Sequence, residues 1–281
     1  MKVGIDLGGT KLLMMAEGAE GRVVSRVPTG SAFGPADLEG AITAFVGSLP
    51  ARPVALGIAV PGLVGADRTV VACDVLPRLV GWRPSRAIAG PWRFAIVNDG
   101  EAALIAEARG EDRAASVVVV MVGTGIGAAF QVDGRVLRGA RGWAGELGSI
   151  PIATGGAVRT LDQLASGQAI VARAECDGAE LAALAARGDA RILAIVREAG
   201  AALGLGLSAV VHLLNPGLLA LGGGVVRLPG YAEAAWAAGR AHTLPALWEA
   251  CAMRMTRDGE QTAAIGAALA ATAERTPEEA S

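Results

Sequence analysis

A chain of 281 residues is long enough for one large domain or two ordinary ones, and we favour two lobes because single cores stop growing at roughly 250 residues. Apolar residues make up 52% of the chain and charged residues only 19%, which excludes a largely disordered protein. The formal net charge of −2 comes without blocks of like charge, so the composition argues against a nucleic-acid-binding protein.

The cysteines and the N-terminus bear on the compartment. Three cysteines are widely spaced and belong to no CxxC pair or histidine cluster, so the sequence predicts neither a disulfide framework nor a zinc site; they are Cys73, Cys176 and Cys251. Met1 runs directly into a strand-like segment at residues 3–7, without the charged and apolar regions of a secretory signal. We therefore expect a cytoplasmic protein.

One long uncharged stretch, residues 199–226, could cross a bilayer on length alone. Turn signals interrupt it at residues 215–217 (Asn-Pro-Gly) and at residues 222–224 (Gly-Gly-Gly). The stretch therefore divides into a helix, a turn, a short strand and a glycine loop. We interpret it as buried core and expect no association with a membrane.

In chain order, the first half begins with short β-like runs at hairpin spacing, which predict an antiparallel meander over residues 3–7, 11–15 and 22–27. A helix is predicted over residues 37–48. Two buried strands follow at residues 54–60, closed by Pro61-Gly62, and at residues 93–97, which lead into a helix after Asn98. Parallel strands joined by helices thus follow the meander.

The second half restarts this pattern. An apolar strand at residues 116–122 runs into a glycine turn at residues 123–127, and a return strand at residues 128–132 ends in the hairpin pair Asp133-Gly134. The similarity to the N-terminus suggests a duplication. Together with the first half, the remaining segments predict an α/β fold with mixed sheets: helices at residues 160–174, 181–187, 189–207 and 261–273, and a strand at residues 251–256.

The segment GIDLGGTK near the N-terminus carries the first chemical signal. It lacks the spacing of a P-loop, because Thr10 precedes Lys11, and it also lacks the spacing of a dinucleotide fingerprint. It provides an acid on a strand, Asp6, and two glycines, Gly8 and Gly9, that let backbone N–H groups approach an anion. This set suits a magnesium-bound phosphate; a tight hairpin with an incidental acid is the structural alternative.

A second glycine turn follows the apolar strand of the other half. Gly123, Thr124 and Gly125 again offer backbone amides and a hydroxyl, although glycine hairpins are also common structural turns. Between the two turns stand Asn98 and Asp99, at the C-terminal end of a strand, where open α/β sheets usually bind ligands. Asp99 could accept a hydroxyl proton in phosphoryl transfer, or either residue could simply cap the following helix.

Three further segments carry weaker signals. Glu146 lies between glycines in a loop suited to close approach of a polyhydroxyl ligand, with a solvated surface loop as the alternative. Asp162, at the start of a helix, is by itself interpreted as compensating the helix dipole. The triplet Gly222, Gly223 and Gly224 follows a strand and could pass beneath an adenine or an α-phosphate, or form only a turn.

Taken in order, these segments resemble the ROK family, the glucokinase-like sugar kinases and related repressors of the actin-like ATPase superfamily. Residues 6–11 are similar to the family's first phosphate motif, residues 123–127 to its second, and residues 221–224 to its nucleotide loop. Asn98-Asp99 matches the pair in which the asparagine binds sugar and the aspartate is the catalytic base. Residues 144–148 match the sugar-binding signature, so the resemblance runs nearly end to end.

The chain departs from the family pattern at its zinc motif. Ser149 occupies the position of the family's histidine, residues 150–160 contain no cysteine, and Asp162 stands where a glutamate is expected. We therefore expect no zinc, because neither a thiolate nor an imidazole remains to bind it. One sugar-contacting side chain is thus lost and another is shortened by a methylene, so glucose-type specificity is not implied.

The resemblance implies a cytoplasmic, ATP-dependent carbohydrate kinase with two RNase-H-like lobes and an interlobe cleft. The small lobe is expected over residues 1–110, completed by a C-terminal helix at residues 260–275, and the large lobe over residues 111–259. It also implies a homodimer and a small-molecule sugar substrate. A DNA-binding repressor is disfavoured, because the family's repressors carry a winged helix-turn-helix before the phosphate motif and this chain begins at the motif.

The family's site residues carry over to this chain by position. ATP and its phosphates would bind the two glycine turns and the glycine loop, with Asp6 holding Mg²⁺ through water: Asp6, Gly8, Gly9, Thr10, Lys11, Gly123, Thr124, Gly125, Gly222, Gly223 and Gly224. Asp99 would take the proton of the attacking hydroxyl, and the sugar would bind Asn98, Glu146, Asp162 and Gly62. The alternatives are a non-catalytic sugar or nucleotide sensor, a kinase of a non-glucose or non-sugar hydroxyl, and a kinase that uses polyphosphate as donor.

Overall fold

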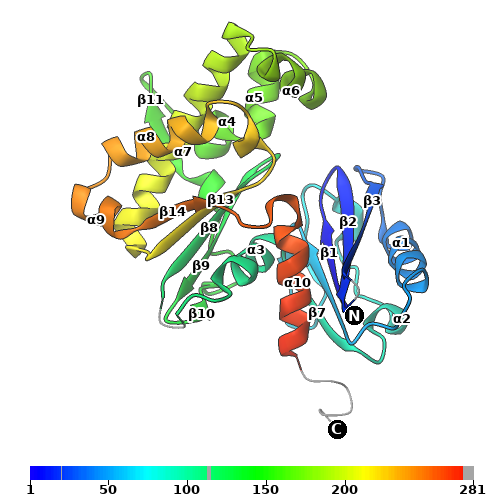
Figure 1. Ribbon diagram of the computed structural model, residues 1–281. Helices are drawn as coiled ribbons and strands as arrows, with labels where there is room; N and C mark the ends of the chain where they lie inside the picture. Colours follow the sequence, from blue (N-terminus) through cyan, green and yellow to red (C-terminus); the bar gives the residue numbers. More distant parts are fainter. Residues whose placement is uncertain (20, 113–114, 275–281) are drawn as a thin grey trace. The chain divides into compact units, whose positions relative to one another are not determined.

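The computed structural model describes residues 1–19, 21–112 and 115–274. This part of the chain forms two compact α/β units, which Figure 1 shows with their elements labelled. Unit 1 comprises Met1–Gly110, Gly139–Trp143 and the chain from Glu260 onward, and unit 2 comprises Glu111–Arg138 and Ala144–Gly259. The predicted end of the last helix, residue 275, lies outside the described residues.

Unit 1 is built on a five-stranded mixed sheet of order β3-β2-β1-β4-β7. The first three strands form the predicted antiparallel meander, and β4 and β7 continue the sheet in parallel with β1. Each predicted strand is confirmed to within three residues at either end. The strands are β1 (Lys2–Leu7), β2 (Lys11–Gly18), β3 (Gly21–Pro28), β4 (Ala55–Val60) and β7 (Arg93–Asn98).

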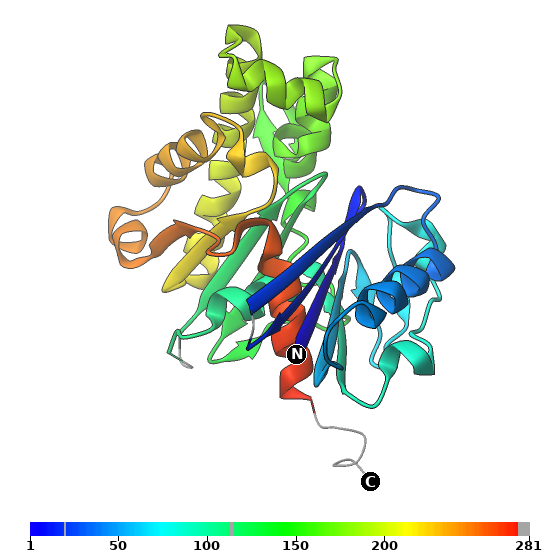
Figure 2. The ribbon, with the colours of Figure 1, turned by 45° about the vertical axis from the view of Figure 1, so that its right-hand side comes forward.

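The two faces of this sheet differ in the size of their side chains. Large residues on one face pack against helix α1 (Pro35–Gly47) and near the short helix α2 (Arg86–Ala89) in one apolar cluster. The other face presents glycine, alanine and Asp6 on β1 and β4, together with Leu13 and Met15 on β2, to α10 (Thr262–Ala273) and α3 (Asp99–Ala108). Figures 1 and 2 show α1 and α10 on opposite sides of the sheet.

The contact of α10 with the sheet and with α3 is close enough to require glycine. A Cβ on Gly57 would overlap the carbonyl oxygen of Ala267, and one on Gly266 would overlap that of Ala102 on α3. The last helix is rich in glycine and alanine, and this close packing lies within unit 1. Because backbone meets backbone here, α10 has a fixed seat on the sheet.

The sheet of unit 2 repeats the sheet of unit 1. Its order is β10-β9-β8-β13-β14, with the first three strands antiparallel and the last two parallel to β8, as in unit 1. The duplication suggested by the sequence is therefore confirmed in strand order and direction. The strands are β8 (Val117–Val122), β9 (Ile126–Val132), β10 (Arg135–Val136), β13 (Leu218–Gly222) and β14 (Ala252–Met255).

Helices cover the sheet of unit 2, and several differ from the prediction. The helix predicted at residues 160–174 is broken at Ser166, whose hydroxyl caps the second piece. The longest helix continues to Leu214 and ends at Asn215, which has a left-handed conformation. The helices at residues 231–241 and 245–250 were not predicted. The covering helices are α4 (Leu161–Ala165), α5 (Gly167–Ala174), α6 (Gly178–Ala186), α7 (Ala190–Leu214), α8 (Tyr231–Ala241) and α9 (Pro245–Ala250).

Helix α7 overlaps the long uncharged stretch at residues 199–226. Among the described residues it is the one helix long and apolar enough to cross a bilayer, and 61% of its most apolar window is buried inside the protein. It packs against α8 and the unit 2 core, which includes the fully buried Tyr231. The interpretation of this segment as helix, turn, strand and glycine loop is confirmed.

In the described part of the chain, two small hairpins and four 3₁₀ turns complete the fold. The segment in which the family carries its cysteine cluster folds here as β11 (Pro151–Thr154) and β12 (Ala157–Thr160), joined by two glycines with positive φ. A second hairpin, β5 (Leu63–Val64) and β6 (Val70–Ala72), belongs to unit 1. The turns are η1 (Pro77–Leu79), η2 (Leu147–Ser149), η3 (Val225–Arg227) and η4 (Gly259–Gln261).

Candidate functional site

The first glycine turn, residues 8–10, is hereafter turn 1. It connects β1 to β2, and the Gly8 N–H closes it by donating to the Lys11 carbonyl at 2.8 Å. The Thr29 hydroxyl fixes the turn from the neighbouring strand by donating to the Gly8 carbonyl at 2.7 Å. Asp6 lies one residue before the end of β1, on the face that carries α10. Turn 1 is thus a rigid hairpin with a carboxylate beside it.

Asp6 and Asp99 influence each other electrostatically. Burial and, to a lesser extent, the negative charge of Asp99 together raise the pKa of Asp6 to about 7, and the Lys11 ammonium opposes both effects. Two carboxylates that disfavour each other's ionisation form a place where a cation is stabilised. Among the described residues no three His, Cys, Asp or Glu side chains gather as a metal-binding group, so a cation here would need ligands from water or phosphate.

Asn98 and Asp99 lie where β7 ends and α3 begins. The Asn98 side chain caps α3 by accepting from the N–H groups of Gly100 at 2.8 Å and Glu101 at 3.2 Å, so the capping interpretation is right for this residue. Its amide also donates to the Gly62 carbonyl at 2.9 Å, and the same NH₂ group has a second N–H for a ligand. The predicted sugar residues Asn98 and Gly62 are therefore neighbours, with Asp99 next in the chain.

The segment at residues 73–75 lies against these residues, and it was not identified as part of the site from the sequence. A Cβ on Gly62 would overlap the carbonyl oxygen of Ala72, and one on Gly9 would meet the Val75 side chain at 3.4 Å. Burial raises the pKa of the Cys73 thiol, and the negative charge of Asp99 adds to that effect. The segment carries no recognisable motif, so only its position identifies it as part of the site.

The second glycine turn, residues 123–125, is hereafter turn 2, and it lies in unit 2. The Gly123 N–H donates to the Gly125 carbonyl at 2.9 Å. The first N–H groups of α5 hold the turn from the other side, because Gly167 donates to the Gly123 carbonyl at 2.9 Å and Gln168 to the Thr124 carbonyl at 3.2 Å. A Cβ on Gly123 would meet nothing within 4 Å, so the turn is open for close approach of a ligand.

Asp162 serves turn 2 rather than the helix on which it lies. The cap of α4 is Thr160, whose hydroxyl accepts from the Gln163 N–H at 3.3 Å. The Asp162 carboxylate instead accepts the Ile126 N–H at 2.7 Å, and a Cβ on Gly148 would overlap it. Burial raises the pKa of Asp162, which the hydrogen bond partly offsets. The carboxylate thus joins turn 2 to the loop that follows Glu146.

Glu146 and the glycine triplet complete the predicted residues of unit 2. Glu146 is exposed and follows Gly145, which has a φ of 109° and packs so closely on the Ala128 carbonyl that no side chain fits. Gly223 likewise has a φ of 100° and packs against the backbone of Val122, the residue before turn 2. The glycine loop and turn 2 are therefore adjacent.

The predicted residues thus form two groups, one in each unit. In unit 1 the structure brings together turn 1, Asp6, Lys11, Gly62, Asn98 and Asp99. In unit 2 it brings together turn 2, Asp162 and residues 222–224 on one side and connects Glu146 to them through Gly148. Each group has a glycine turn at the end of the central strand and at least one acid.

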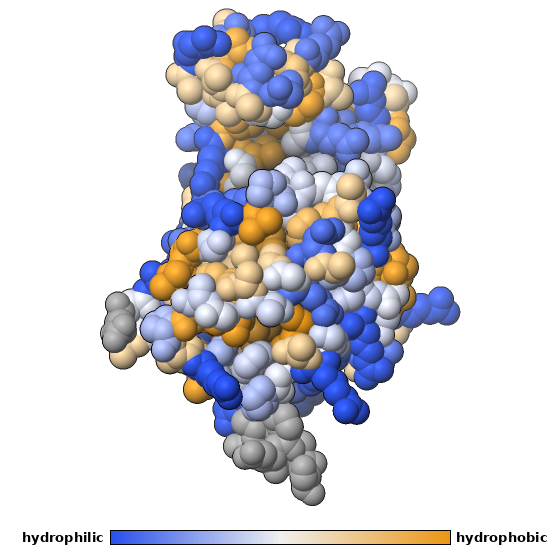
Figure 3. All heavy atoms as spheres, turned by 90° about the vertical axis from the view of Figure 1, so that its right-hand side faces the viewer, coloured by the Kyte–Doolittle hydropathy of each residue, from blue (hydrophilic) through white to orange (hydrophobic). Residues whose placement is uncertain are grey.

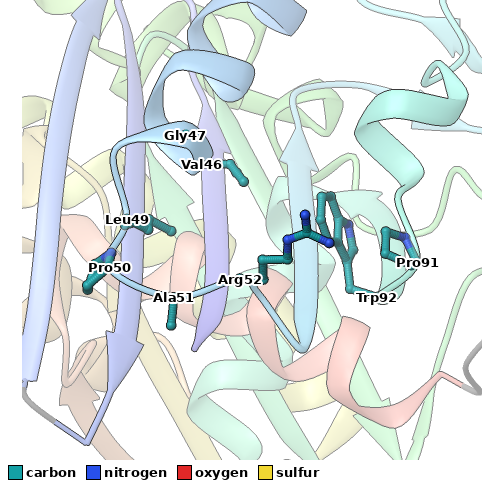
Figure 4. A pocket seen from close by; sticks show the side chains of 8 residues that line it. All are labelled: Val46, Gly47, Leu49, Pro50, Ala51, Arg52, Pro91 and Trp92. Carbon is teal, nitrogen blue, oxygen red and sulfur yellow. The ribbon is translucent and has the colours of Figure 1, made fainter.

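A pocket of about 430 Å³ lies elsewhere in unit 1. It is formed around Leu49, Arg52 and Trp92, before the first residues of β4 and β7, whereas Asn98 lies at the last residue of β7. Figure 4 shows Arg52 reaching toward the Trp92 ring, and Figure 3 shows that the face of the molecule drawn there has apolar patches between polar side chains. The pocket therefore contains none of the predicted site residues.

Comparison with known proteins gives the family. The model of the ROK family matches residues 2–274, and the chain belongs to this family. The ROK hexokinase from Thermus thermophilus is similar at 32% identity, with 96% of this chain and 97% of that chain covered and a TM-score of 0.74. The RNase-H-like α/β fold predicted from the motifs is confirmed by this likeness.

Two other similarities have lower sequence identity. A ROK glucokinase from Streptomyces griseus, solved with glucose and AMPPNP, has a TM-score of 0.79 at 22% identity, with 96% and 99% of the two chains covered, and this likeness concerns the fold alone. The bifunctional enzyme NanE/NanK from Brucella melitensis is 28% identical over 242 residues, or 81% of this chain. The chain spans 46% of the length of that relative.

Proposed function

We propose that this protein is an ATP-dependent sugar kinase, which transfers the γ-phosphoryl group of ATP to a hydroxyl of a hexose or a hexose derivative. One arrangement carries the proposal: Asp6, on the strand that leads into turn 1, lies near Asp99, and the Asn98-Asp99 pair belongs to the same group of residues in unit 1. A base for the acceptor hydroxyl and an acid for the metal–phosphate group therefore occur side by side in one unit. The kinship with a ROK hexokinase supports the hexose class.

The proposed mechanism assigns each group a physical role. Asp6 would hold Mg²⁺ through water, and the ion would supply positive charge to the phosphates there. The backbone amides of turn 1 and turn 2 orient the β- and γ-phosphates, and the loop at residues 222–224 passes beneath the nucleotide. Asn98, Glu146, Asp162 and Gly62 orient the sugar. Asp99 takes the proton of the attacking hydroxyl as the oxygen approaches phosphorus in line with the leaving group.

We also propose that the two units act as the lobes of the kinase, with residues 1–110 and 260–275 as the small lobe and residues 111–259 as the large lobe. The matching sheet topologies, each with a glycine turn on its central strand, support this assignment. Closure of the lobes around substrate would exclude water and limit wasteful hydrolysis of ATP.

The experiment is ADP release in the presence of Mg²⁺ on a panel of hexoses, hexosamines and their N-acetyl forms, with polyphosphate tested as an alternative donor. Asp99→Asn is the decisive variant, because the Asp99 side chain accepts the Gly100 N–H at 2.8 Å and an asparagine oxygen keeps that bond. A general base contributes roughly 10²- to 10⁴-fold, and we expect kcat to fall by that factor.

Glu233→Gln, which removes an exposed carboxylate on α8, serves as the matched control and is expected to leave kcat unchanged. Equal turnover by Asp99→Asn and the wild-type protein would rule out the role of Asp99. Calorimetry that shows tight sugar binding without turnover for any donor would favour a non-catalytic sensor, the alternative suggested by Ser149 and by the cysteine-free hairpin at residues 151–160.

The protein is further proposed to work as a cytoplasmic homodimer without structural zinc. Its three cysteines are free in the structure, which suits a reducing compartment. The segment of the family's cysteine cluster is a hairpin that contains no cysteine or histidine. Light scattering at micromolar concentration and metal analysis of the purified protein test these two points; a monomer, or one bound zinc per chain, contradicts them.

A further inference from the structure

Lys11 is one of only two lysines in the chain, and it follows turn 1 directly. It begins β2, and the register of the meander places it on the same face as Arg26 of β3 and as the α10 helix. A lysine side chain has about 2 kcal/mol of rotamer entropy, so an isolated lysine at this place would be poorly ordered. Its ammonium group needs a partner to be kept at the turn.

That partner is Glu260, a residue that no motif identified. Its carboxylate accepts from the Lys11 ammonium at 2.7 Å, and its other oxygen pairs with the Arg26 guanidinium. Hydrogen bonds from Lys11 and then from Arg26 lower the pKa of Glu260 to about 2, so it stays ionised throughout the physiological range. One carboxylate thus bridges two cations from adjacent strands.

The backbone of Glu260 has a fixed position. The chain enters unit 1 at this residue and passes into α10 two residues later. Helix α10 is held by backbone contacts where no side chain fits, with the sheet at Gly57 and with α3 at Gly266. Glu260 therefore extends from a rigid support toward turn 1, whereas Lys11 alone has four rotatable methylenes.

The arrangement leaves donors and charge for a ligand. An ammonium group has three N–H donors, and the bond to Glu260 uses one of them. The cluster formed by Lys11, Arg26 and Glu260 has two cations and one carboxylate, and the neighbouring Asp6 offsets this excess positive charge only where it is ionised. A phosphate at turn 1 would lie next to this cluster.

We propose that Glu260 is a positioning residue of the kinase, which holds the Lys11 ammonium at turn 1 for the terminal phosphates of the nucleotide. The inference rests on the proposed function, because it takes the ligand of turn 1 to be a nucleoside triphosphate. Arg26 acts one step further away, since it occupies the second carboxylate oxygen and so fixes the orientation of Glu260.

The test is calorimetric binding of ATP and of AMP to the full chain, in the presence of Mg²⁺ and without turnover. For Glu260→Gln we expect ATP to bind about five- to tenfold more weakly, the equivalent of one charge-assisted hydrogen bond that is only partly lost, and AMP to bind within twofold of the wild-type affinity. Loss of folding would weaken both nucleotides equally, so the ratio separates positioning from stability.

Two further variants sharpen this test. Lys11→Met should weaken ATP binding more than Glu260→Gln does. The double variant should bind ATP no more weakly than Lys11→Met alone, because Glu260 acts through Lys11. Glu17→Gln is the matched control, since Glu17 pairs with Arg22 at 2.8 Å on the same meander but at the far end of the strands. We expect Glu17→Gln to change the affinity for neither ATP nor AMP.

Three results would overturn the role of Glu260: ATP affinity unchanged or increased in Glu260→Gln, equal weakening of ATP and AMP, or additive effects in the double variant. They are distinct from failure of the proposed function. A wild-type chain that binds no ATP would refute the proposed kinase function, and with it this inference. Normal turnover by the wild-type protein, together with unchanged ATP affinity in Glu260→Gln, would refute only the positioning role.

Discussion

The two glycine turns follow the central strands of sheets with the same order and directions, but they obtain their acids differently. In turn 1 the acid is Asp6 on the preceding strand, and burial and the charge of Asp99 work against its ionisation. In turn 2 the acid is Asp162, which comes from α4 and accepts a hydrogen bond from the Ile126 backbone.

Burial opposes the ionisation of both acids, and a hydrogen bond from the Ile126 backbone offsets part of this cost for Asp162. A partly buried carboxylate beside a second carboxylate is unfavourable unless a cation binds, so Asp6 is best explained by a ligand that arrives after folding. A carboxylate bound to a backbone N–H organises the turn in the absence of any ligand. The predictions below test this division between the two halves of a duplicated fold.

The largest effect is expected for Asp6→Asn. If Asp6 holds the Mg²⁺–phosphate group, its neutralisation removes several kcal/mol of electrostatic stabilisation, and kcat/KM for ATP should fall on the order of 10²-fold or more. Steady-state kinetics over a range of Mg²⁺ concentrations measure this. A variant with wild-type kcat/KM at all Mg²⁺ concentrations would show that Asp6 has no part in the reaction.

Asp162→Ala should lower stability, in addition to any effect on the sugar that Asp162 is proposed to orient. It leaves the Ile126 N–H without its carboxylate partner, and we expect the free energy of unfolding to fall by about 2 kcal/mol. Asp162→Asn keeps an acceptor oxygen of similar size and should lose less than half as much. Urea unfolding measures both; equal losses in the two variants would mean that the charge of Asp162, not its hydrogen bond, stabilises turn 2.

The pH dependence of stability gives a third comparison. The pKa of Asp6 is raised to about 7 in the folded protein from its ordinary value of 3.8, so the folded state binds more protons between these values. Stability contributed by Asp6 is therefore present below about pH 4 and is lost as the pH rises to about 7. After a discount for partial exposure, the loss is on the order of 1 to 2 kcal/mol.

The measurement is urea unfolding of the wild-type protein and of Asp6→Asn in EDTA, at pH 5 and at pH 8. Because other groups also titrate, the useful quantity is the difference between the two proteins. The variant should be the more stable at pH 8 and should approach the wild-type value at pH 5. A difference that is independent of pH would contradict the raised pKa of Asp6.

Most of the fold could be predicted because its signals are local. The β-branched strands, the glycine turns and the break at Asn215-Pro216 each depend on a few neighbouring residues, and all were confirmed. The segment at residues 231–250 was not assigned, although it forms α8 and α9. The helix after Thr160 was predicted as one piece, because a single serine, Ser166, does not change the helix-favouring composition of the 15-residue segment.

The site could be predicted only where a motif marks it. Turn 1 and the pair Asn98-Asp99 were located from sequence, whereas Glu260 and Val75 reach turn 1 through contacts between distant parts of unit 1. An isolated acid or valine carries no signal of such contacts. The hydrogen bond of Asp162 to Ile126 was likewise unpredictable, since the helix start offered a sufficient explanation for an acid.

The smallest effect is expected for an added methyl group in turn 2. A Cβ on Gly123 would meet no protein atom within 4 Å, and the residue does not have a positive φ, so Gly123→Ala should change stability by less than about 0.5 kcal/mol. If phosphate approaches this open backbone, the methyl group should still raise the KM for ATP about fivefold, the equivalent of about 1 kcal/mol of crowding. Gly40→Ala, also in open space but on α1, is the control for a methyl group far from the turn. An unchanged KM in Gly123→Ala would mean that turn 2, despite its open backbone, does not contact the nucleotide, and the resemblance between the two turns would then be one of topology alone.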